Sequence, residues 1–383
     1  MTRKRPRNGY GPNVKLTAVE LRRISLPLVA PFRTSFGTEL TKEAVLVRAL
    51  TPDGEGWGEC VAMDAPLYSY EYVETATDVI KRFLLPRLFA AGDVTAGQVA
   101  HVLEPIKGHP MAKAAVEMAL LDAELRQAGQ SLATFFGAVR DRVPSGVSVG
   151  IMDTVPALLD TVGGYLDAGY VRIKLKIEPG WDVEPVRAVR ERFGDDLLLQ
   201  VDANTAYTLG DARQLAKLDP FDLLLIEQPL PEDDVRGHAE LARRIKTPIC
   251  LDESVTSARS AADAIALGAC QIINVKPGRV GGYLEARRIA AIAAANGVPV
   301  WCGGMLETGI GRATNLALAA LPNFTLPGDT SASARYFAED LTEPFVLEPD
   351  GTMAVPDGPG IGVVPRPERL EACTVRHEVL TRA

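Results

Sequence analysis

The chain has 383 residues, of which 47% are apolar and 23% charged. This length allows two or three domains, or one large barrel with a smaller partner domain, and the composition excludes a chain that is disordered throughout. Lysine and arginine together number 41 against 49 acidic residues, a net charge of -8, which leaves no basic field for a nucleic acid or an anionic membrane surface. No apolar stretch approaches the roughly 18 residues of a membrane span, and no secretory apolar block opens the sequence. These features predict a cytoplasmic protein whose partners are neither nucleic acid nor membrane.

Cysteine and histidine offer no framework for a metal site or for disulfides. The five cysteines are an odd number without a C-x-x-C pair, so we expect them to be packing residues. The four histidines are scattered without metal-ligand spacing. A catalytic base must therefore be sought among the lysines and carboxylates.

The first segment in chain order is a basic tail. Residues 1–15 carry five basic side chains and no acidic ones, together with glycine and proline. This composition buries too little surface to order itself, so we expect a flexible tail. Weak binding of nucleic acid by the tail is the alternative.

The next segment is predicted to be an α+β capping domain over residues 16–140. Three runs rich in β-branched residues, separated by proline and glycine, predict a small antiparallel sheet. The three runs cover residues 16–26, 43–50 and 56–61. Helical periodicity follows at residues 70–89 and 111–128.

After about residue 144, short β-rich runs alternate with longer helical ones, which is the signal of βα units and a parallel sheet. The predicted strands are 146–151, 171–177, 197–202, 223–227, 249–252, 272–276, 298–302 and 324–326. The predicted helices are 155–168, 182–194, 209–218, 233–245, 257–268, 281–296 and 311–321. This order predicts a modified (β/α)7β TIM barrel, of the α/β class, over residues 141–328, with residues 329–383 returning to the capping domain. An open doubly wound sheet is the alternative, but no G-x-G-x-x-G motif or P-loop supports it.

Ionisable side chains stand at the ends of four successive predicted strands. Asp202, Glu227, Asp252 and Lys276 follow one another at steps of 25, 25 and 24 residues, one βα unit each. Because the carboxyl ends of barrel strands converge on one mouth, where this fold builds its active sites, we expect these side chains to meet. The alternative is that these are salt-bridged residues at the rim of the barrel. That alternative accounts for one or two such positions, but not for ionisable residues at the same position of four successive strands.

Two lysines are predicted to point into the barrel. Lys174 and Lys176 share one face of the second predicted strand, because side chains alternate along a strand. The apolar residues between them belong against the helices. A buried ammonium group is costly unless carboxylates stand nearby, and the neighbouring strand ends supply them.

Three converging carboxylates would repel one another unless they were protonated or neutralised. Ligation by oxygen alone favours a hard divalent cation, so we expect Mg²⁺ (or Mn²⁺) with Asp202, Glu227 and Asp252 as ligands. Positions left open on the ion suit a substrate carboxylate. Removing a proton next to that carboxylate gives an enediolate, whose second negative charge needs strong electrostatic stabilisation. Lys176 and Lys276 lie four strands apart and are expected to face one carbon from two sides.

The motifs at these positions resemble the muconate-lactonising subgroup of the enolase superfamily. They are Lys174-x-Lys176, Asp202-x-Asn204, Glu227-Gln228-Pro229, Asp252-Glu253-Ser254 and Lys276-Pro277-Gly278-Arg279-x-Gly281-Gly282. Within this subgroup, residues 31–38, 63–68 and 301–309 resemble the o-succinylbenzoate synthase and N-succinylamino acid (N-acylamino acid) racemase family. The resemblance extends from about residue 14 to residue 365.

The resemblance implies roles for individual residues. It implies that Asp202, Glu227 and Asp252 bind the metal. It implies that Lys176 and Lys276 are the acid and base, and that Lys174 holds the substrate carboxylate and favours the neutral form of Lys176. Asn204 and Glu253 are implied to support this centre, the latter beside Lys276.

A further group is implied to surround the substrate. Phe32, Met63 and Tyr68 are expected to border its side chain, and Ser148 with the backbone of Gly303, Gly304 and Met305 to lie near an acyl amide. An ordinary apolar domain interface is the alternative for these residues. The resemblance also implies a homo-oligomer.

Two activities of this family share one intermediate. In the racemase, one lysine removes the α-proton of an N-succinyl or N-acetyl amino acid, and the other returns a proton to the opposite face. In the synthase, a cyclohexadiene carboxylate loses a proton to Lys176 and then water, while Lys276 only stabilises. The whole-chain resemblance favours the racemase, with synthase activity possible alongside it.

Other readings are less well supported by the residues. Dipeptide epimerases place a D-x-D motif after the last strand, whereas only Asp329 is acidic in residues 328–333. The mandelate-type branch needs a His-Asp pair on later strands, and no histidine lies between residues 239 and 376. A barrel without catalytic activity that binds a metal or a partner is the alternative from another class.

Overall fold

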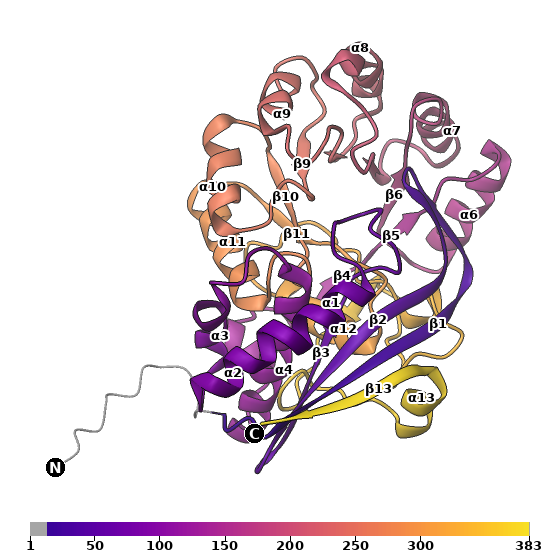
Figure 1. Cartoon of the computed structure of the whole chain (residues 1–383). Helices are drawn as coiled ribbons and strands as arrows, with labels where there is room; N and C mark the ends of the chain where they lie inside the picture. Colours follow the sequence, from indigo (N-terminus) through magenta and orange to yellow (C-terminus); the bar gives the residue numbers. More distant parts are fainter. Residues whose placement is uncertain (1–13, 383) are drawn as a thin grey trace.

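The computed structural model describes residues 14–382, and it consists of two joined parts (Figure 1). One part is an antiparallel sheet with helices packed on it, and the other is a curled parallel sheet surrounded by helices. This arrangement confirms the predicted fold class. None of the helices in residues 14–382 combines the length and the apolar character that a membrane span requires.

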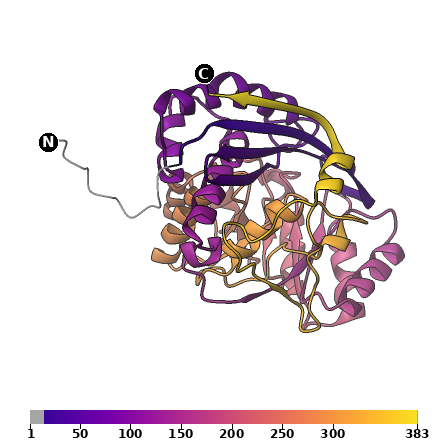
Figure 2. The same cartoon turned by 90° about the horizontal axis from the view of Figure 1, so that it is seen from below.

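The antiparallel sheet combines the two ends of the chain. Its strand order is β13-β1-β2-β3. The strands are β1 (Ala18–Thr34), β2 (Gly37–Thr51), β3 (Gly54–Cys60) and β13 (Thr374–Thr381). β13 pairs with β1 from Ala18 opposite Thr381 to Ile24 opposite Thr374, and Figure 2 shows the two strands side by side. The C-terminal segment therefore returns to the N-terminal part, as predicted.

β1 is longer than the run predicted at residues 16–26. Pro27 and Pro31 do not end it, although the register with β2 shifts just after Pro27. β13 no longer pairs with this half of β1, so the half lies at a sheet edge, where a residue without an N–H group is tolerated. The hairpin of β1 and β2 consequently extends beyond the sheet toward the barrel, where the Ser35 hydroxyl donates to the carbonyl oxygen of Ala203 at 3.2 Å.

Helices cover this sheet. A continuous helical run consists of α1 (Val73–Val79), a π-helical turn η1 (Ile80–Leu84) and α2 (Leu85–Ala91), and it is followed by α3 (Ala96–Leu103), α4 (Pro110–Ala128) and α5 (Leu132–Phe136). The sequence did not predict α3 and α5, because helices this short show little periodicity. α4 packs directly on β3, since Gly56 and Gly58 carry no side chain to hold it away.

The first seven predicted barrel strands are present and all run parallel, in the order β11-β10-β9-β8-β7-β6-β5. They are β5 (Gly146–Val149), β6 (Arg172–Lys176), β7 (Leu198–Asp202), β8 (Ile226–Glu227), β9 (Ile249–Leu251), β10 (Ile272–Val275) and β11 (Val300–Cys302). The helices between them are α6 (Val155–Asp167), α7 (Val183–Phe193), η2 (Leu209–Asp211) with α8 (Ala212–Leu215) and η3 (Ala216–Phe221), α9 (Val235–Leu241), α10 (Ala258–Leu267), α11 (Tyr283–Ala295) and α12 (Gly309–Ala319). They lie close to the predicted ranges.

The eighth predicted strand, residues 324–326, is not a continuous strand. Phe324 makes an isolated bridge to Val300 of β11, and Gly328, two residues after the segment, makes another to Ser145, just before β5. These two bridges close the ring between the last and the first strand without a full ladder. The rest of the C-terminal segment forms η4 (Ser333–Arg335), β12 (Thr352–Ala354) paired with β4 (Arg142–Pro144), and α13 (Pro367–Cys373).

The basic tail predicted for residues 1–15 lies outside the described residues except for its last two. Of these, Val14 is buried and its N–H donates to the carbonyl oxygen of Val94 at 3.1 Å. All five cysteines are buried and unpaired, as predicted.

We expect Gly58→Ala to lower stability, because the new Cβ would lie 2.1 Å from the carbonyl oxygen of Ala115 and force α4 away from β3. Overpacking of this kind costs about 1–3 kcal/mol and should lower Tm by several degrees in a calorimetric scan. Gly164→Ala is the control, since Gly164 lies on the exposed face of α6 with no atom near its missing Cβ. That change should leave Tm unchanged or raise it slightly. An unchanged Tm for Gly58→Ala would contradict the close packing.

Candidate active site

Consecutive strands bring their last side chains to one end of the barrel. Lys176 at the end of β6 pairs in register with Asp202 of β7, and Asp202 pairs with Glu227 of β8. Glu227 pairs with Cys250 of β9, so Asp252 lies two residues further along and on the same face. All five side chains are buried. The structure thus brings the predicted carboxylates together.

An apolar layer closes the barrel beneath these charges. It is formed by Leu225, Cys250, Ile272 and Trp301. The Lys174 ammonium lies 4.9 Å from the centroid of the Trp301 ring, which confirms that this side chain points into the barrel. All four side chains are buried, so they lower the local dielectric constant and strengthen the charge interactions beside them.

Lys174 is held by three carboxylates. Its Nζ lies 2.6 Å from Asp329, 3.0 Å from Glu227 and 3.2 Å from Asp202. Burial alone would lower the pKa of Lys174, but the three carboxylates, Asp329 foremost, outweigh it and raise the pKa well above its ordinary value. Lys174 is therefore a fixed cation at the floor of the site.

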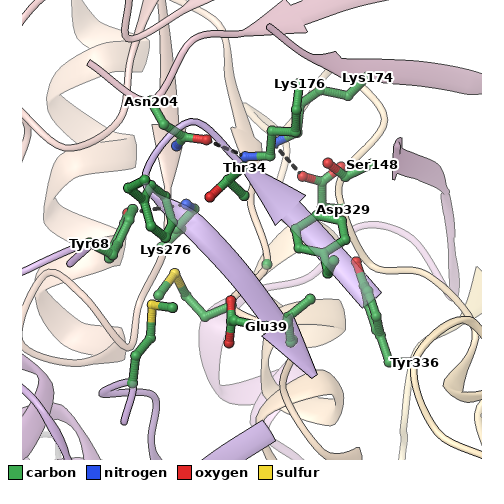
Figure 3. A pocket seen from close by; sticks show the side chains of 16 residues that line it. Thr34, Glu39, Tyr68, Ser148, Lys174, Lys176, Asn204, Lys276, Asp329 and Tyr336 are labelled. Atoms are coloured by element: carbon green, nitrogen blue, oxygen red, sulfur yellow. Dashed lines mark hydrogen bonds and ion pairs between the residues drawn. The ribbon is translucent and has the colours of Figure 1, made fainter. Parts of the chain in front are cut away.

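The other two lysines enter the site from strands that lie four apart in the sheet order. Lys176 donates to Asp202 Oδ2 and to Asn204 Oδ1, both at 2.6 Å. Lys276 donates to Asp252 Oδ2 at 2.6 Å and to the Tyr68 hydroxyl at 3.2 Å. Figure 3 shows the two side chains approaching the same pocket from different walls. Burial opposes the ammonium form of Lys276, yet Asp252 and other nearby anions raise its pKa well above the ordinary value.

The loops after the strands fix these groups. The Asn204 amide donates to Glu253 Oε1 at 2.9 Å, and the Gln228 side-chain oxygen accepts the backbone N–H of Asp252 at 3.0 Å. Asn204 and Gln228 both adopt positive φ, 40° and 37°, which costs on the order of 1–3 kcal/mol per residue and is typical of functional sites. Arg279 makes an ion pair of 2.9 Å with Asp252.

A pocket opens between the two parts of the molecule, directly over the lysines. Phe32, Thr34, Phe36, Glu39, Met63 and Tyr68 line it from the N-terminal part, and Ser148, Lys174, Lys176, Asn204, Lys276, Gly304, Met305, Leu306, Asp329 and Tyr336 from the barrel side. Aromatic pairs strengthen its walls, with ring centroids 5.8 Å apart for Phe36 and Tyr68 and 6.2 Å for Phe32 and Tyr336.

Comparison with known proteins gives the family. Residues 17–137 match the mandelate racemase / muconate lactonizing enzyme N-terminal domain, and residues 157–369 match the enolase C-terminal domain-like family. An N-succinylamino acid racemase of Amycolatopsis sp. is 70% identical over 94% of this chain and 98% of its own length. The chain belongs to the N-succinylamino acid racemase and o-succinylbenzoate synthase family of the enolase superfamily. It is therefore an enzyme, and the resemblance seen in its motifs is confirmed.

Other relatives in this family are named o-succinylbenzoate synthase. An o-succinylbenzoate synthase of Geobacillus kaustophilus is 48% identical over 91% of this chain and 93% of its own length. Among solved structures, an enolase superfamily member from Listeria innocua Clip11262 has a TM-score of 0.92 at 41% identity and covers 97% of this chain and 100% of that chain. Muconate lactonizing enzyme from Pseudomonas fluorescens has a TM-score of 0.88 at 28% identity and covers 95% and 100%. These structures support the TIM-barrel and capping-domain fold of the enolase superfamily.

Sequence reasoning placed most of the lining residues of this enolase-superfamily pocket, and their roles stay predictions. Gly303 is the exception, since it lies against Asn274, where a Cβ would be 2.4 Å from the side-chain oxygen. Six lining residues were not predicted to belong to the site, namely Thr34, Phe36, Glu39, Leu306, Asp329 and Tyr336. Tyr68 was expected only to border the substrate, but it also contacts Lys276. Thr34, Phe36, Glu39 and Leu306 lie within or next to the quoted motifs, and this closeness is the signal that could have found them. No such signal marks Tyr336.

Members of the enolase superfamily generally use a divalent cation, usually Mg²⁺. Within residues 14–382, no three His, Cys, Asp or Glu side chains are arranged to hold an ion as they lie, and the predicted ligands instead contact lysine ammonium groups. Their chemistry nevertheless fits a hard cation, because all three are buried carboxylates. The metal-ligand role stays a prediction.

We expect Asp329→Asn to destabilise the protein, because it leaves Arg172 and Lys174 buried without a carboxylate that lies 2.8 Å and 2.6 Å away. Removing one partner of a buried pair costs about 3–5 kcal/mol, measurable by urea unfolding at neutral pH. Asp153→Asn is the control, since this side chain is 96% exposed and 3.6 Å from Arg33; it should cost less than about 1 kcal/mol.

The pH dependence of the Asp329→Asn effect follows from the same contacts. Burial alone would raise the pKa of Asp329, but Lys174 and Arg172 hold it below the ordinary value of 3.8. A lowered folded-state pKa gives stability that is complete above the unfolded value and lost as the pH falls through the folded one. The difference between wild type and variant should therefore be constant near neutral pH and shrink only below about pH 4. A difference that vanished at pH 6 would contradict this assignment.

Proposed function

We propose that this enzyme racemises N-acylated amino acids, including N-succinyl and N-acetyl derivatives. One of Lys176 and Lys276 removes the α-proton, and the other returns a proton to the opposite face of the same carbon. The observation that carries the proposal is that both lysines line one pocket from strands four apart, each held by its own carboxylate. Racemisation needs two such groups, whereas dehydration by the synthase needs only one base. The 70% identity to the Amycolatopsis racemase supports the same choice.

Each of the chain's groups has a task in this reaction. Lys174 attracts the substrate carboxylate to the floor of the pocket, and Lys176 removes the α-proton from one face. Lys276 delivers a proton to the other face, and the two exchange roles for the opposite enantiomer. Asn204 and Tyr68 hold the two amines in place, so proton transfer needs little reorganisation.

Asp202, Glu227 and Asp252 are the residues that would hold Mg²⁺ (or Mn²⁺). When bound, the cation would supply electrostatic stabilisation for the negative charge that develops on the substrate carboxylate. Asp202 also contacts Lys176, and Asp252 contacts Lys276. The same carboxylates thus link the metal site to the two proton-transfer groups.

The pocket favours an acylated nitrogen over a free ammonium. Asp329, the single acid in the segment where dipeptide epimerases have two, is already paired with Arg172 and Lys174. The hydroxyl of Ser148 lines the pocket, is buried and has no hydrogen-bond partner among residues 14–382. An amide group of the substrate would satisfy it.

The second candidate activity is o-succinylbenzoate synthase. Relatives of that name at 41% to 48% identity favour it, and Lys176 is placed to be its base. Assaying racemisation and dehydration on one preparation, with kcat/KM for each, separates the two activities. A higher kcat/KM for dehydration would make the synthase the main activity.

We expect wild-type enzyme with Mg²⁺ in D₂O to exchange the α-hydrogen of N-acetyl-methionine for deuterium. The optical rotation of a solution that starts from one enantiomer should fall to zero. Lys276→Ala should lower the racemisation rate by at least about 10³-fold, as for other removed acid-base groups. It should still exchange the proton of the one enantiomer that faces Lys176. Lys176→Ala should show the opposite preference, as followed by NMR.

Lys217→Ala is the matched control for these variants, because Lys217 is exposed and only contacts Gln214. It should keep wild-type rates. Racemisation that survives Lys276→Ala would refute the two-lysine assignment, and absence of exchange with every N-acyl amino acid would refute the racemase. A barrel without catalysis predicts no exchange in any variant.

We expect isothermal titration calorimetry to detect one bound Mg²⁺ or Mn²⁺ per chain, and chelation to stop proton exchange reversibly. Glu227→Gln removes one of three anionic ligands and should weaken the binding by at least tenfold. Glu232→Gln, at an exposed position outside the site, is the control and should bind like wild type. Equal affinities for wild type and Glu227→Gln would exclude Glu227 as a ligand.

A further inference from the structure

Glu39 is an acidic residue inside the pocket for which the reaction has no use. It belongs to β2, opposite Phe32 of β1, and its side chain lines the pocket. Figure 3 shows it at the far end of the view from Lys174 and Lys176, with Tyr68 on one side and Tyr336 on the other. It therefore faces the part of a substrate that extends away from the reacting carbon.

The Glu39 carboxylate has no ion-pair or hydrogen-bond partner among residues 14–382. Burial raises its pKa, and the charges of Lys42 and Lys176 act in the opposite direction, but neither lysine forms an ion pair or hydrogen bond with it. Lys42 donates instead to the carbonyl oxygen of Met305 at 2.8 Å, and Lys176 to Asp202 and Asn204. A partly desolvated carboxylate without a donor gains free energy from any cation or N–H group brought to it.

The other polar groups of the pocket decide which part of the substrate reaches Glu39. The substrate carboxylate belongs with Lys174, and the acyl amide belongs with the unpartnered hydroxyl of Ser148. The remaining substituent on the reacting carbon is the amino-acid side chain, which is left with the wall formed by Phe32, Phe36, Met63 and Tyr68. Glu39 lies in this wall, opposite Phe32.

We propose that Glu39 selects N-acyl amino acids whose side chain ends in a cation or an N–H donor, such as those of lysine and arginine, and disfavours side chains that end in a carboxylate. An apolar wall with one acid at its end matches a chain of methylene groups with a positive tip. This inference rests on the proposed racemase function and names its preferred substrates.

The test compares kcat/KM for racemisation of N-acetyl-lysine, N-acetyl-methionine and N-acetyl-glutamate by wild type and Glu39→Gln. The acetyl group is uncharged, so the three substrates differ in charge only at the side chain, and glutamine preserves the shape of residue 39. We expect the variant to lose about tenfold or more on N-acetyl-lysine, to stay within about twofold on N-acetyl-methionine, and to gain on N-acetyl-glutamate. Glu43→Gln, on the same strand but paired with Arg23, should leave all three values unchanged.

Four outcomes would overturn the inference. Equal losses of kcat/KM on all three substrates would show that Glu39 supports the shape of the pocket and does not discriminate between side-chain charges. A changed ratio of N-succinyl-methionine to N-acetyl-methionine, with an unchanged side-chain series, would show that Glu39 faces the acyl group. Absence of wild-type activity on N-acetyl-methionine would remove the racemase and this inference together, whereas activity without charge preference removes the inference alone.

Discussion

The structure depends on the mutual compensation of buried charges at the carboxyl end of the barrel. Asp202, Glu227 and Asp252 come from neighbouring strands and would repel one another in a medium of low dielectric constant. Lys174, Lys176 and Lys276 stand among them at distances of 2.6 to 3.2 Å. Neither set could be buried without the other, so the stability of the barrel mouth depends on both together. A change that neutralises one member alters the state of all the rest.

The N-terminal part completes the site and is tied to the barrel by buried carboxylates of its own. Glu59 of β3 accepts the hydroxyl of Thr308 at 2.7 Å and the backbone N–H of Gly311 at 3.0 Å, at the start of α12. Glu117 of α4 accepts the backbone N–H of Tyr283 at 2.8 Å, at the start of α11. Both contacts place the acceptor oxygens of a carboxyl group at the unpaired N–H groups of a barrel helix's first turn. They fix the relative position of the two parts that share the pocket.

The barrel and its charged centre could be predicted from the sequence because both follow a local rule. One βα unit separates each acidic strand end from the next, so position along the chain translates directly into position around the mouth. The same rule says nothing about Glu39 or Tyr336, which reach the pocket through a hairpin and an irregular segment. Their location depends on how two parts of the molecule pack. The length of β1 was missed for a related reason, since Pro27 ends a strand inside a sheet but not at an edge created by distant pairing.

The pairing of β13 with β1 means that the antiparallel sheet is completed only late in synthesis. β13, an eight-residue strand that follows the barrel in the sequence, pairs with the outer edge of β1. During synthesis this edge of β1 therefore stays unpaired until the whole barrel has been translated. Such an edge is prone to pairing with other nascent chains. The hairpin of β1 and β2, which covers the pocket, begins with this same strand. A chain that lacked β13 would therefore keep Lys174, Lys176 and Lys276 in the barrel, but the hairpin over the pocket would lose the strand that flanks its first half.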